Sequence, residues 1–126
     1  MTIPRSHASE YFPNEAASVR KARRMVATTL DASGIDSEVP VVVTSELATN
    51  ALKHAETGFE VSVTVEEDAV RIEVQDGAGA MGVASDLARD SGGFGLRLVE
   101  QFSTEWGVEI RGEDKAVWVR IPRVAS

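Results

Sequence analysis

The sequence predicts a fold of the α+β class, a two-layer α/β sandwich in which helices cover one face of a mostly antiparallel, mixed sheet. Up to residue 55, apolar residues recur at the spacing of amphipathic helices, whereas after residue 58 they alternate with polar ones, as in half-buried strands. The alternating segments come in pairs around short polar turns, which is typical of β-hairpins. Helices grouped ahead of hairpins favour this sandwich over a doubly wound parallel fold, in which the two would alternate.

Two helices are predicted in the first half of the chain. Asn14 is expected to cap the N-terminus of the first helix, which covers Glu15–Leu30 and ends at Ser33-Gly34. The second helix runs through Val41–Ala55, with Pro40 in its first turn, where the missing N–H costs no hydrogen bond. Consecutive valines lower the helix propensity at its start.

The remaining predicted elements are strands and one short helix. They are an edge strand at Glu10–Pro13, strands at Phe59–Val65 and Val70–Val74, a helix at Gly95–Phe102, and strands at Trp106–Arg111 and Ala116–Ile121. A loop rich in Gly, Ala, Ser and Asp is expected between Gly77 and Ser91, with one helical turn at Ser85–Arg89.

Length and composition indicate one globular unit. We expect a flexible tail over residues 1–9 and a single domain over 10–126, long enough to bury a core. The chain has no cysteine, which excludes disulfides, thiolate zinc sites and cysteine nucleophiles. No apolar run approaches the length of a membrane span, and the first residues lack the apolar core of a secretory signal. A cytoplasmic protein without membrane contact is expected.

The charge of the chain argues against direct binding to nucleic acid. The net charge is −7, whereas non-specific nucleic-acid binding needs a basic surface. Arg20, Lys21, Arg23 and Arg24 form one local exception on the first predicted helix. They are either a solvated helix face or a patch that binds an acidic protein partner.

The second helix carries a polar stripe that is a candidate for chemistry. Glu46, Asn50 and His54 are spaced i, i+4 and i+8, so their side chains stack on one side of the helix. A carboxylate and an amide oxygen one turn apart can hold a hard cation or a proton inside a cleft. Alone the stripe is equally compatible with a solvated helix face.

Two glycine clusters downstream add weight to this stripe. Asp76-Gly77-Ala78-Gly79 follows a predicted strand, where glycine permits positive φ and lets a flat ligand approach the backbone. Gly92-Gly93-Phe94-Gly95 opens a helix, whose free N–H groups and dipole suit phosphate. A simple Asp-Gly turn is the alternative for the first cluster. No P-loop and no G-x-S-x-G elbow is present, which leaves a nucleotide site assembled from a helix, a strand end and a loop.

Taken together, these motifs resemble the GHKL (Bergerat-fold) ATP-binding family, and within it the bacterial anti-sigma-factor serine/threonine kinases. The segment 45–55 resembles the family's N-box, 76–79 its first glycine box and 93–96 its second. The opening Tyr11-Phe12-Pro13 and the closing hairpin with Trp106-Gly107 also resemble this subfamily. The resemblance covers nearly the whole chain in the family's order, which makes it more specific than any single box.

The resemblance implies a role for each matching residue. Glu46 would be the general base for a protein serine or threonine hydroxyl, and Asn50 would bind the Mg²⁺ that bridges the ATP phosphates. Asp76 would accept a hydrogen bond from the adenine amino group. The other implied nucleotide-binding residues are Gly77, Gly79, Gly93, Phe94, Gly95, Leu96, Lys53 and His54. For Lys53 and His54 a surface and a hydrogen-bonded structural role are the alternatives, and Phe94 is expected to pack beneath the loop.

The resemblance also implies a function and partners. An ATP-Mg²⁺-dependent kinase would sequester a sigma factor, phosphorylate an anti-anti-sigma antagonist of the STAS type and act as a homodimer. The alternative is an ATP-binding regulatory module that sequesters a protein partner without kinase activity. Ala116 stands where these kinases often carry a hydroxyl residue that helps to hold adenine, and the predicted loop is short and poor in cations. Both departures favour the alternative.

Overall fold

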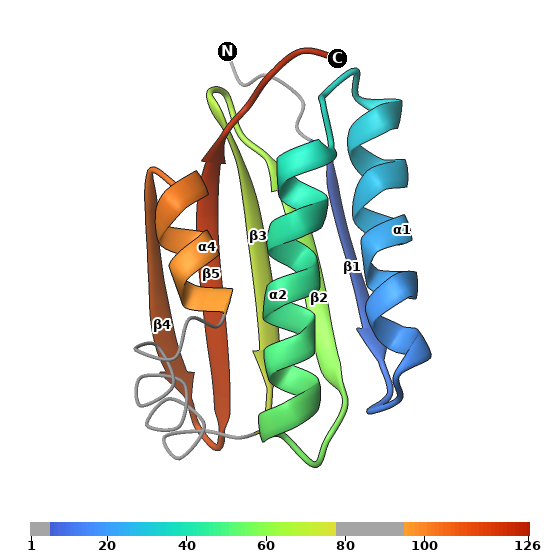
Figure 1. Cartoon of the computed structure of the whole chain (residues 1–126), viewed down its shortest axis with the longest axis vertical. Helices are drawn as coiled ribbons and strands as arrows, with labels where there is room; N and C mark the ends of the chain where they lie inside the picture. The colour runs from blue at the N-terminus through green and yellow to red at the C-terminus, as the bar shows by residue number, and fades with distance from the viewer. Residues whose placement is uncertain (1–5, 78–94) are drawn as a thin grey trace.

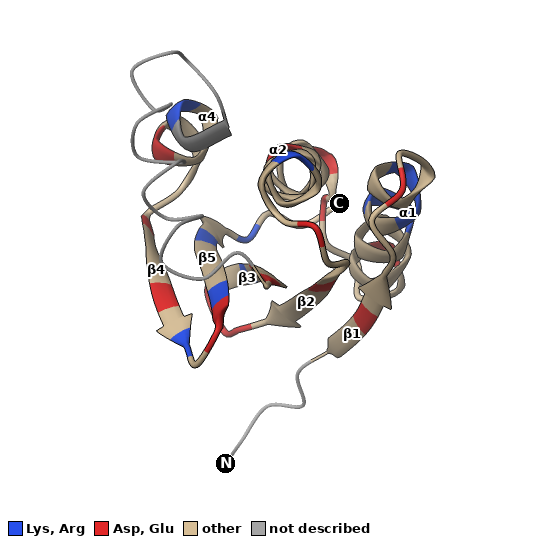
Figure 2. Cartoon of the chain, turned by 90° about the horizontal axis from the view of Figure 1, so that it is seen from below, with Lys and Arg blue, Asp and Glu red and all other residues tan. Residues whose placement is uncertain are grey.

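The computed structural model of the chain describes residues 6–77 and 95–126, and these form a five-stranded sheet with three helices on one face (Figures 1 and 2). The elements, in chain order, are β1 (His7–Phe12), α1 (Ala17–Ala32), α2 (Glu38–His54), β2 (Phe59–Val65), β3 (Ala69–Asp76), α4 (Gly95–Phe102), β4 (Glu105–Arg111) and β5 (Asp114–Pro122).

The strands lie in the order β1-β2-β3-β5-β4, and every neighbouring pair is antiparallel. The pairs β2-β3 and β4-β5 are the two expected hairpins. The second closes around Gly112, whose φ of 64° is a conformation that glycine adopts without strain. The α+β sandwich is therefore confirmed, and its described strands are antiparallel throughout rather than mixed.

The hydrophobic core lies between the sheet and the helix layer. Alternate residues of β2, from Phe59 to Val65, are buried against the helices, while those between them face the opposite side of the sheet. Helix α1 contributes Ala22, Val26 and Leu30 at the spacing of one helical face. This arrangement leaves the second face of the sheet uncovered by helices (Figure 2).

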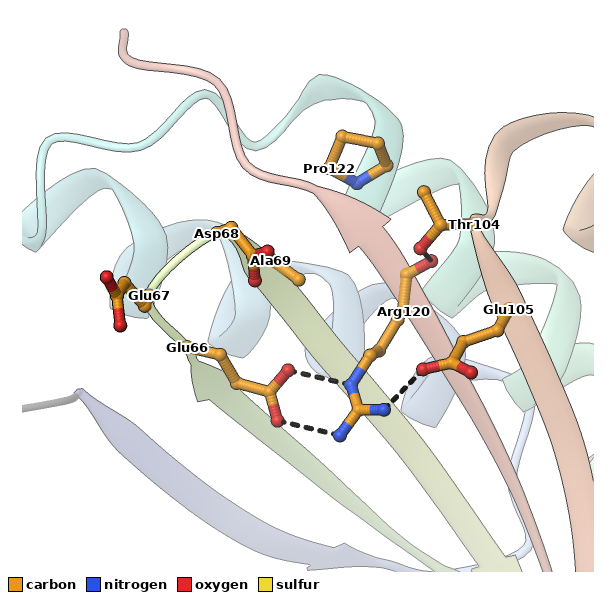
Figure 3. A pocket seen from close by; sticks show the side chains of 8 residues that line it. All are labelled: Glu66, Glu67, Asp68, Ala69, Thr104, Glu105, Arg120 and Pro122. Carbon is orange, nitrogen blue, oxygen red and sulfur yellow. Dashed lines mark hydrogen bonds and ion pairs between the residues drawn. The ribbon is translucent and has the colours of Figure 1, made fainter.

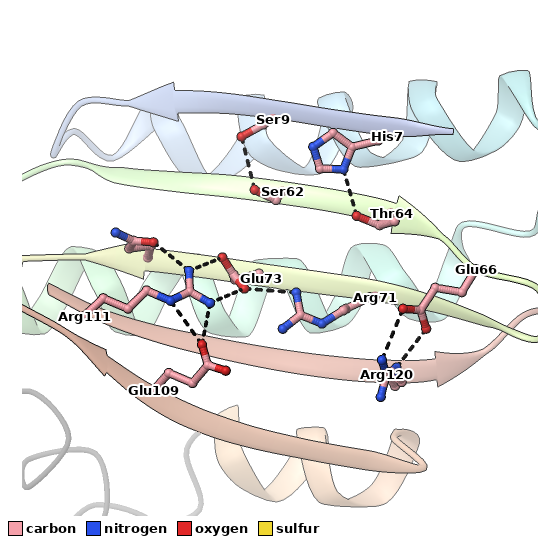
Figure 4. Close-up of polar contacts among 11 residues, drawn as sticks. His7, Ser9, Ser62, Thr64, Glu66, Arg71, Glu73, Glu109, Arg111 and Arg120 are labelled. Carbon is pink, nitrogen blue, oxygen red and sulfur yellow. Dashed lines mark hydrogen bonds and ion pairs between the residues drawn. The ribbon is translucent and has the colours of Figure 1, made fainter. Parts of the chain in front are cut away.

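The N-terminal strand is longer than expected. It begins at His7 instead of Glu10, so residues 7–9 of the expected tail belong to the sheet. Apolar alternation is weak there because the strand lies at the sheet edge and its outer side chains are polar. His7 Nδ1 lies 2.8 Å from Thr64 Oγ1, and Ser9 Oγ lies 3.1 Å from Ser62 Oγ (Figure 4). Backbone pairing with β2 and these side-chain contacts hold the segment in place.

Asn14 does not cap α1, which begins at Ala17 without a side-chain cap. Instead, the Asn14 amide donates to backbone carbonyls at the far end of α2: to Ala55 O at 2.7 Å, Thr57 O at 3.2 Å and Leu52 O at 3.4 Å. These carbonyls follow the last helical hydrogen bonds and need donors from elsewhere. Asn14 therefore fixes the C-terminal end of α2 to the β1–α1 turn.

Helix α2 lies in the middle of its layer, between α1 and α4 (Figure 1). Its valine-rich start is helical because packing overrides weak propensity: Val43 is fully buried and Pro40 is buried in the first turn. None of the helices in the described ranges is long and apolar enough to cross a membrane.

Candidate functional site

Two segments that are distant in sequence end at the same end of the molecule: α2 ends there, and β3 ends there at Asp76 (Figure 1). Helices α2 and α4 pack against each other and run in opposite directions, so the start of α4 at Gly95 lies beside the middle of α2 (Figure 1). The predicted site residues that the structure describes lie between the middle of α2 and this end.

Glu46 and Asn50 lie on the side of α2 that faces α4. Val39 lines a small cavity together with Phe102 of α4, whereas Val41 lines a groove together with arginines of α1. Glu46 and Asn50 follow Val39 by seven and eleven residues, which places them on the Val39 side of the helix. Both are half-buried at the border of the core. The predicted polar stripe thus borders the space between α2 and α4.

Asp76 points to the helix-covered side of the sheet. It shares this side with Val74 in the core, and its exposed fraction is 4%. Its cross-strand partner on β5 is Lys115, which is 1% exposed, and Lys115 Nζ lies 3.5 Å from Asp76 Oδ2. Burying a charge is costly unless it has a partner, so the two side chains depend on each other. Asp76 is where the sequence places it, but its buried partner was not predicted.

The register of β5 could have revealed Lys115. Counting back by twos from Ile121 through Val119 and Val117 leads to Lys115 on the core side. The same count places Ala116, which pairs with Gln75, on the side of the sheet opposite to Asp76. The role of its missing hydroxyl in adenine binding stays a prediction.

Gly77 follows Asp76 and is held by Thr57. The Gly77 N–H donates to Thr57 Oγ1 at 3.0 Å, and a Cβ at Gly77 would lie 2.8 Å from the same oxygen. Gly77 is needed for this close approach and not for positive φ, which among described residues occurs only at Gly34 and Gly112. Asp76 and Gly77 also line a cavity of about 280 Å³ with Thr57 and Gly58. No motif in the sequence marks Thr57 as a residue of this site.

Lys53 and His54 form the last turn of α2, at the same end of the molecule. Lys53 is exposed and His54 is half-buried, and each has an interaction partner in the structure. The positive charge of Lys53 also suits the negative end of the helix dipole. Contact between either side chain and a phosphate stays a prediction.

Part of the predicted glycine clusters lies outside the described residues. Gly79, Gly93 and Phe94 belong to the range 78–94, as do the expected loop and its helical turn. Gly95 and Leu96 are the first two residues of α4. The backbone start of this helix, with its free N–H groups, lies beside the middle of α2 (Figure 1).

A second cavity lies at the opposite end of the molecule and does not suit a nucleotide. It measures about 570 Å³ and is lined by Glu66, Glu67, Asp68 and Glu105 (Figure 3). Its one cation, Arg120, already binds Glu66 through Nε at 2.8 Å and also pairs with Glu105. An acidic cavity whose guanidinium is engaged would repel phosphates.

The described residues at the Asp76 end fit a purine nucleotide with a divalent cation. A buried carboxylate can accept a hydrogen bond from an exocyclic amine, and an amide oxygen such as that of Asn50 is a ligand for Mg²⁺. Within the described ranges, no three His, Asp or Glu side chains come close enough to hold a metal ion by themselves. A cation at Asn50 would thus need phosphate oxygens as further ligands, as Mg²⁺ does in nucleotide sites.

Comparison with known proteins agrees with this geometry. The profile of the histidine kinase-like ATPase domain matches residues 12–121. The RsbU and RsbW domains of Rv1364c from Mycobacterium tuberculosis superpose with a TM-score of 0.71 at 17% identity, covering 93% of this chain and 32% of that chain. Histidine kinase AdeS from Acinetobacter baumannii gives 0.56 at 17% identity, covering 91% of this chain and 67% of the other.

At these identities the two structures establish a shared fold. The present chain spans about a third of the length of the mycobacterial protein chain. A comparison with curated protein sequences gave no significant match.

Proposed function

Because the chain belongs to the histidine kinase-like ATPase domain family, we propose that it is an ATP- and Mg²⁺-dependent serine/threonine kinase and anti-sigma factor. It phosphorylates an anti-anti-sigma antagonist of the STAS type, which regulates transcription by partner switching. The observation that carries this proposal is the position of Glu46 and Asn50 on the α4 side of α2, at the end where β3 delivers Asp76.

The chemistry asks mainly for positioning and charge neutralisation. Glu46 takes the proton of the antagonist's hydroxyl as that oxygen bonds to the γ-phosphorus and the bond to ADP breaks. Asn50 would hold Mg²⁺, whose charge would neutralise the phosphates. Asp76 would accept a hydrogen bond from the base, and the free N–H groups at the start of α4 would bind phosphate oxygens.

A basic surface on α1 supports binding of an acidic protein partner. Arg20, Lys21, Arg23 and Arg24 are exposed, and none of them forms an ion pair within the described part of the chain. The three arginines line a groove of about 290 Å³ with Ala27 and Val41 (Figure 2 shows the basic residues on α1). In a protein with a net charge of −7, such a group of unpaired cations suits an acidic protein surface.

Glu46→Gln tests the kinase proposal. The variant keeps the size of the side chain and removes the base, so phosphate transfer to the antagonist should fall by about 100-fold or more. Transfer is measured with radioactive γ-phosphate, and ATP binding by calorimetry should be retained. Glu67→Gln, an exposed change in the turn between β2 and β3 at the other end of the molecule, is the matched control. Equal transfer by wild type and Glu46→Gln would remove Glu46 from the mechanism.

The second candidate is an ATP-binding regulatory module that sequesters its partner without phosphotransfer. The basic groove on α1 favours partner binding whether or not the site transfers phosphate. Wild-type protein that binds ATP in calorimetry and captures a sigma factor, but labels no antagonist, would establish this candidate. The double change Arg23→Glu and Arg24→Glu should weaken capture by about 10-fold or more without changing ATP affinity.

We also propose a homodimer, as the family resemblance implies. The outer edges of β1 and β4 are free of strand partners among the described residues, and edge strands are suited to pairing with a second chain. Sedimentation equilibrium with and without ATP measures the oligomeric state. A monomer in both conditions would contradict this part of the proposal.

A further inference from the structure

The connection between α2 and β2 is tied to two other parts of the chain by side-chain hydrogen bonds. Asn14 Nδ2 donates to Ala55 O at 2.7 Å and to Thr57 O at 3.2 Å. Thr57 Oγ1 in turn accepts a hydrogen bond from the Gly77 N–H at 3.0 Å. Thr57 therefore joins a connection that Asn14 holds in place to the residue that follows β3.

The contact between Thr57 and Gly77 lies where the ladder of β2 and β3 ends. Phe59 and Asp76 are the last residues that pair between these strands. Beyond them, the Gly77 N–H donates to a side-chain oxygen. A Cβ at Gly77 would lie 2.8 Å from Thr57 Oγ1 and 3.0 Å from Thr57 Cγ2, so the hydroxyl and the methyl group both lie against the Gly77 backbone. The Thr57 side chain thus sets where the chain leaves β3.

Fold stability gives little reason for this contact. Thr57 and Gly77 are both exposed, so water can take the place of the hydroxyl if it is lost. Substitutions at exposed positions usually change the free energy of unfolding only slightly. What the hydrogen bond does fix is the backbone directly after Asp76, the carboxylate that accepts a hydrogen bond from the base in the proposed nucleotide site.

We propose that Thr57 is a positioning residue of the nucleotide site, which acts by fixing the Gly77 backbone beside Asp76. This inference rests on the proposed nucleotide site and deepens it. Lys115, whose Nζ lies 3.5 Å from Asp76 Oδ2, holds the side chain of Asp76, whereas Thr57 holds the backbone that follows it. Binding depends on such support, because a group that is displaced by a fraction of an ångström loses much of its contribution.

Thr57→Val tests this role. Valine keeps the shape of the side chain but places a methyl carbon where the hydroxyl accepts the Gly77 N–H, and non-bonded heavy atoms prefer to lie about 3.5 Å or more apart. Gly77 must therefore move, and the Kd for Mg²⁺-ATP in calorimetry should rise by about 10-fold. Thr57→Ser retains the hydroxyl and should bind ATP within about twofold of wild type. Thr64→Val is the matched control, because it removes a hydroxyl that contacts His7 at the other end of β2.

Two further measurements separate positioning from a purely structural role. The amide signal of Gly77 in the NMR spectrum of ¹⁵N-labelled protein should shift in Thr57→Val, which lacks the acceptor, and should stay near its wild-type position in Thr57→Ser. The urea midpoint of both variants should stay close to that of wild type, because the contact is exposed. Loss of affinity without loss of stability, with rescue by serine, is the expected result.

The outcomes distinguish this inference from the proposed function. If wild-type protein binds no ATP, the proposed nucleotide site itself is wrong. If wild type and Thr57→Val bind ATP equally well, or if Thr57→Ser weakens binding as much as Thr57→Val, only the role of the Thr57 hydroxyl is overturned. An unchanged Gly77 signal in Thr57→Val would overturn it as well. Thr57→Ala, which removes the hydroxyl without adding bulk, decides the question if Thr57→Val does not fold.

Discussion

The two faces of the sheet both carry ion pairs, but the pairs differ in how far they are exposed to solvent. On the uncovered face, Arg111 bridges Glu73 and Glu109 and also donates to Gln75 at 2.9 Å (Figure 4). On the helix-covered face, Lys115 and Asp76 pair with each other away from solvent. Arg111 keeps 38% of its side chain exposed, whereas Lys115 keeps 2%. Solvent screens the first group of charges and not the second.

The uncovered face forms a layer of mutual contacts. A Cβ at Gly107 would lie 2.8 Å from the Trp118 ring, so the ring lies close against this glycine. The guanidinium carbons of Arg71 and Arg120 lie 5.4 Å and 5.8 Å from the centre of the Trp118 ring, within cation–π range. Arg71, Arg111 and Arg120 each have a carboxylate partner as well. The cations of this face are engaged, unlike those of α1.

The two kinds of ion pair differ in what they contribute to the folded protein. Charges that remain near water and pair among themselves contribute modestly to stability. A fully buried charge pair is often no more stable than apolar side chains of the same volume, although removing one partner alone is strongly destabilising. The Asp76–Lys115 pair meets the second description and lies where β3 ends and β5 begins.

The largest expected effect comes from breaking the buried pair on one side only. Asp76→Leu leaves the Lys115 ammonium without this partner and should lower the free energy of unfolding by about 3 kcal/mol. Adding Lys115→Met should restore most of this loss, because both charges are then gone, yet nucleotide binding should remain absent. Urea denaturation of the wild type, both single variants and the double variant measures the coupling. A double variant as unstable as Asp76→Leu would show that the two charges do not depend on each other.

A smaller effect separates structural from functional polar residues on the covered side. Asn14→Ala removes the donor to three carbonyls at the end of α2 and should cost about 1–2 kcal/mol in the free energy of unfolding. Asn50→Ala is the matched control, because it should leave stability nearly unchanged and weaken Mg²⁺-ATP binding. Urea denaturation and calorimetry on both variants test this contrast. Equal stability losses would place Asn50 in the fold rather than in the site.

The sequence predicts the architecture well because periodicity reports burial. The change from helical to alternating spacing after residue 58 correctly separates α1 and α2 from the hairpins, and both hairpin turns lie where expected. The start of β1 was missed because an edge strand that is held by backbone pairing needs no apolar alternation. Asn14 was misassigned because a cap residue before a helix can also cap another helix that is distant in sequence.

The candidate site is predicted only in part, for a related reason. Motif spacing identifies Glu46, Asn50 and Asp76, since each belongs to one local pattern. The partner of Lys115 is Asp76, 39 residues away in the sequence, and the partner of Thr57 is Gly77, 20 residues away. Only strand register and tertiary contacts reveal such pairs. Motif spacing cannot tell Ala116 from Lys115 as the residue on the side of Asp76. Neighbouring residues in a strand face opposite sides of the sheet, so a difference of one residue changes the side.

On the uncovered face, removing a central cation should have a modest effect. Arg111→Met takes away the contacts to Glu73, Glu109 and Gln75 and should lower the free energy of unfolding by about 1 kcal/mol or less at neutral pH. Salt should reduce the difference from wild type, because the guanidinium is partly exposed. Urea denaturation at low and high sodium chloride measures both. A loss as large as that of Asp76→Leu would contradict the contrast between the faces.

The smallest effect is the pH dependence of this difference, and its sign follows from Glu73. Burial raises the pKa of Glu73, but the hydrogen bonds and charges of Arg111 and Arg71 outweigh it and hold the pKa below its ordinary value. A carboxyl group whose pKa is lower in the folded state stabilises the protein above its unfolded pKa of about 4.3, and this contribution is lost as the pH falls through the folded value. The gap between wild type and Arg111→Met should therefore narrow as the pH is lowered from about 7 to about 3 in urea titrations. A gap that widens in acid would mean that Arg111 acts through packing on Trp118 and its neighbours and not through the charge of Glu73.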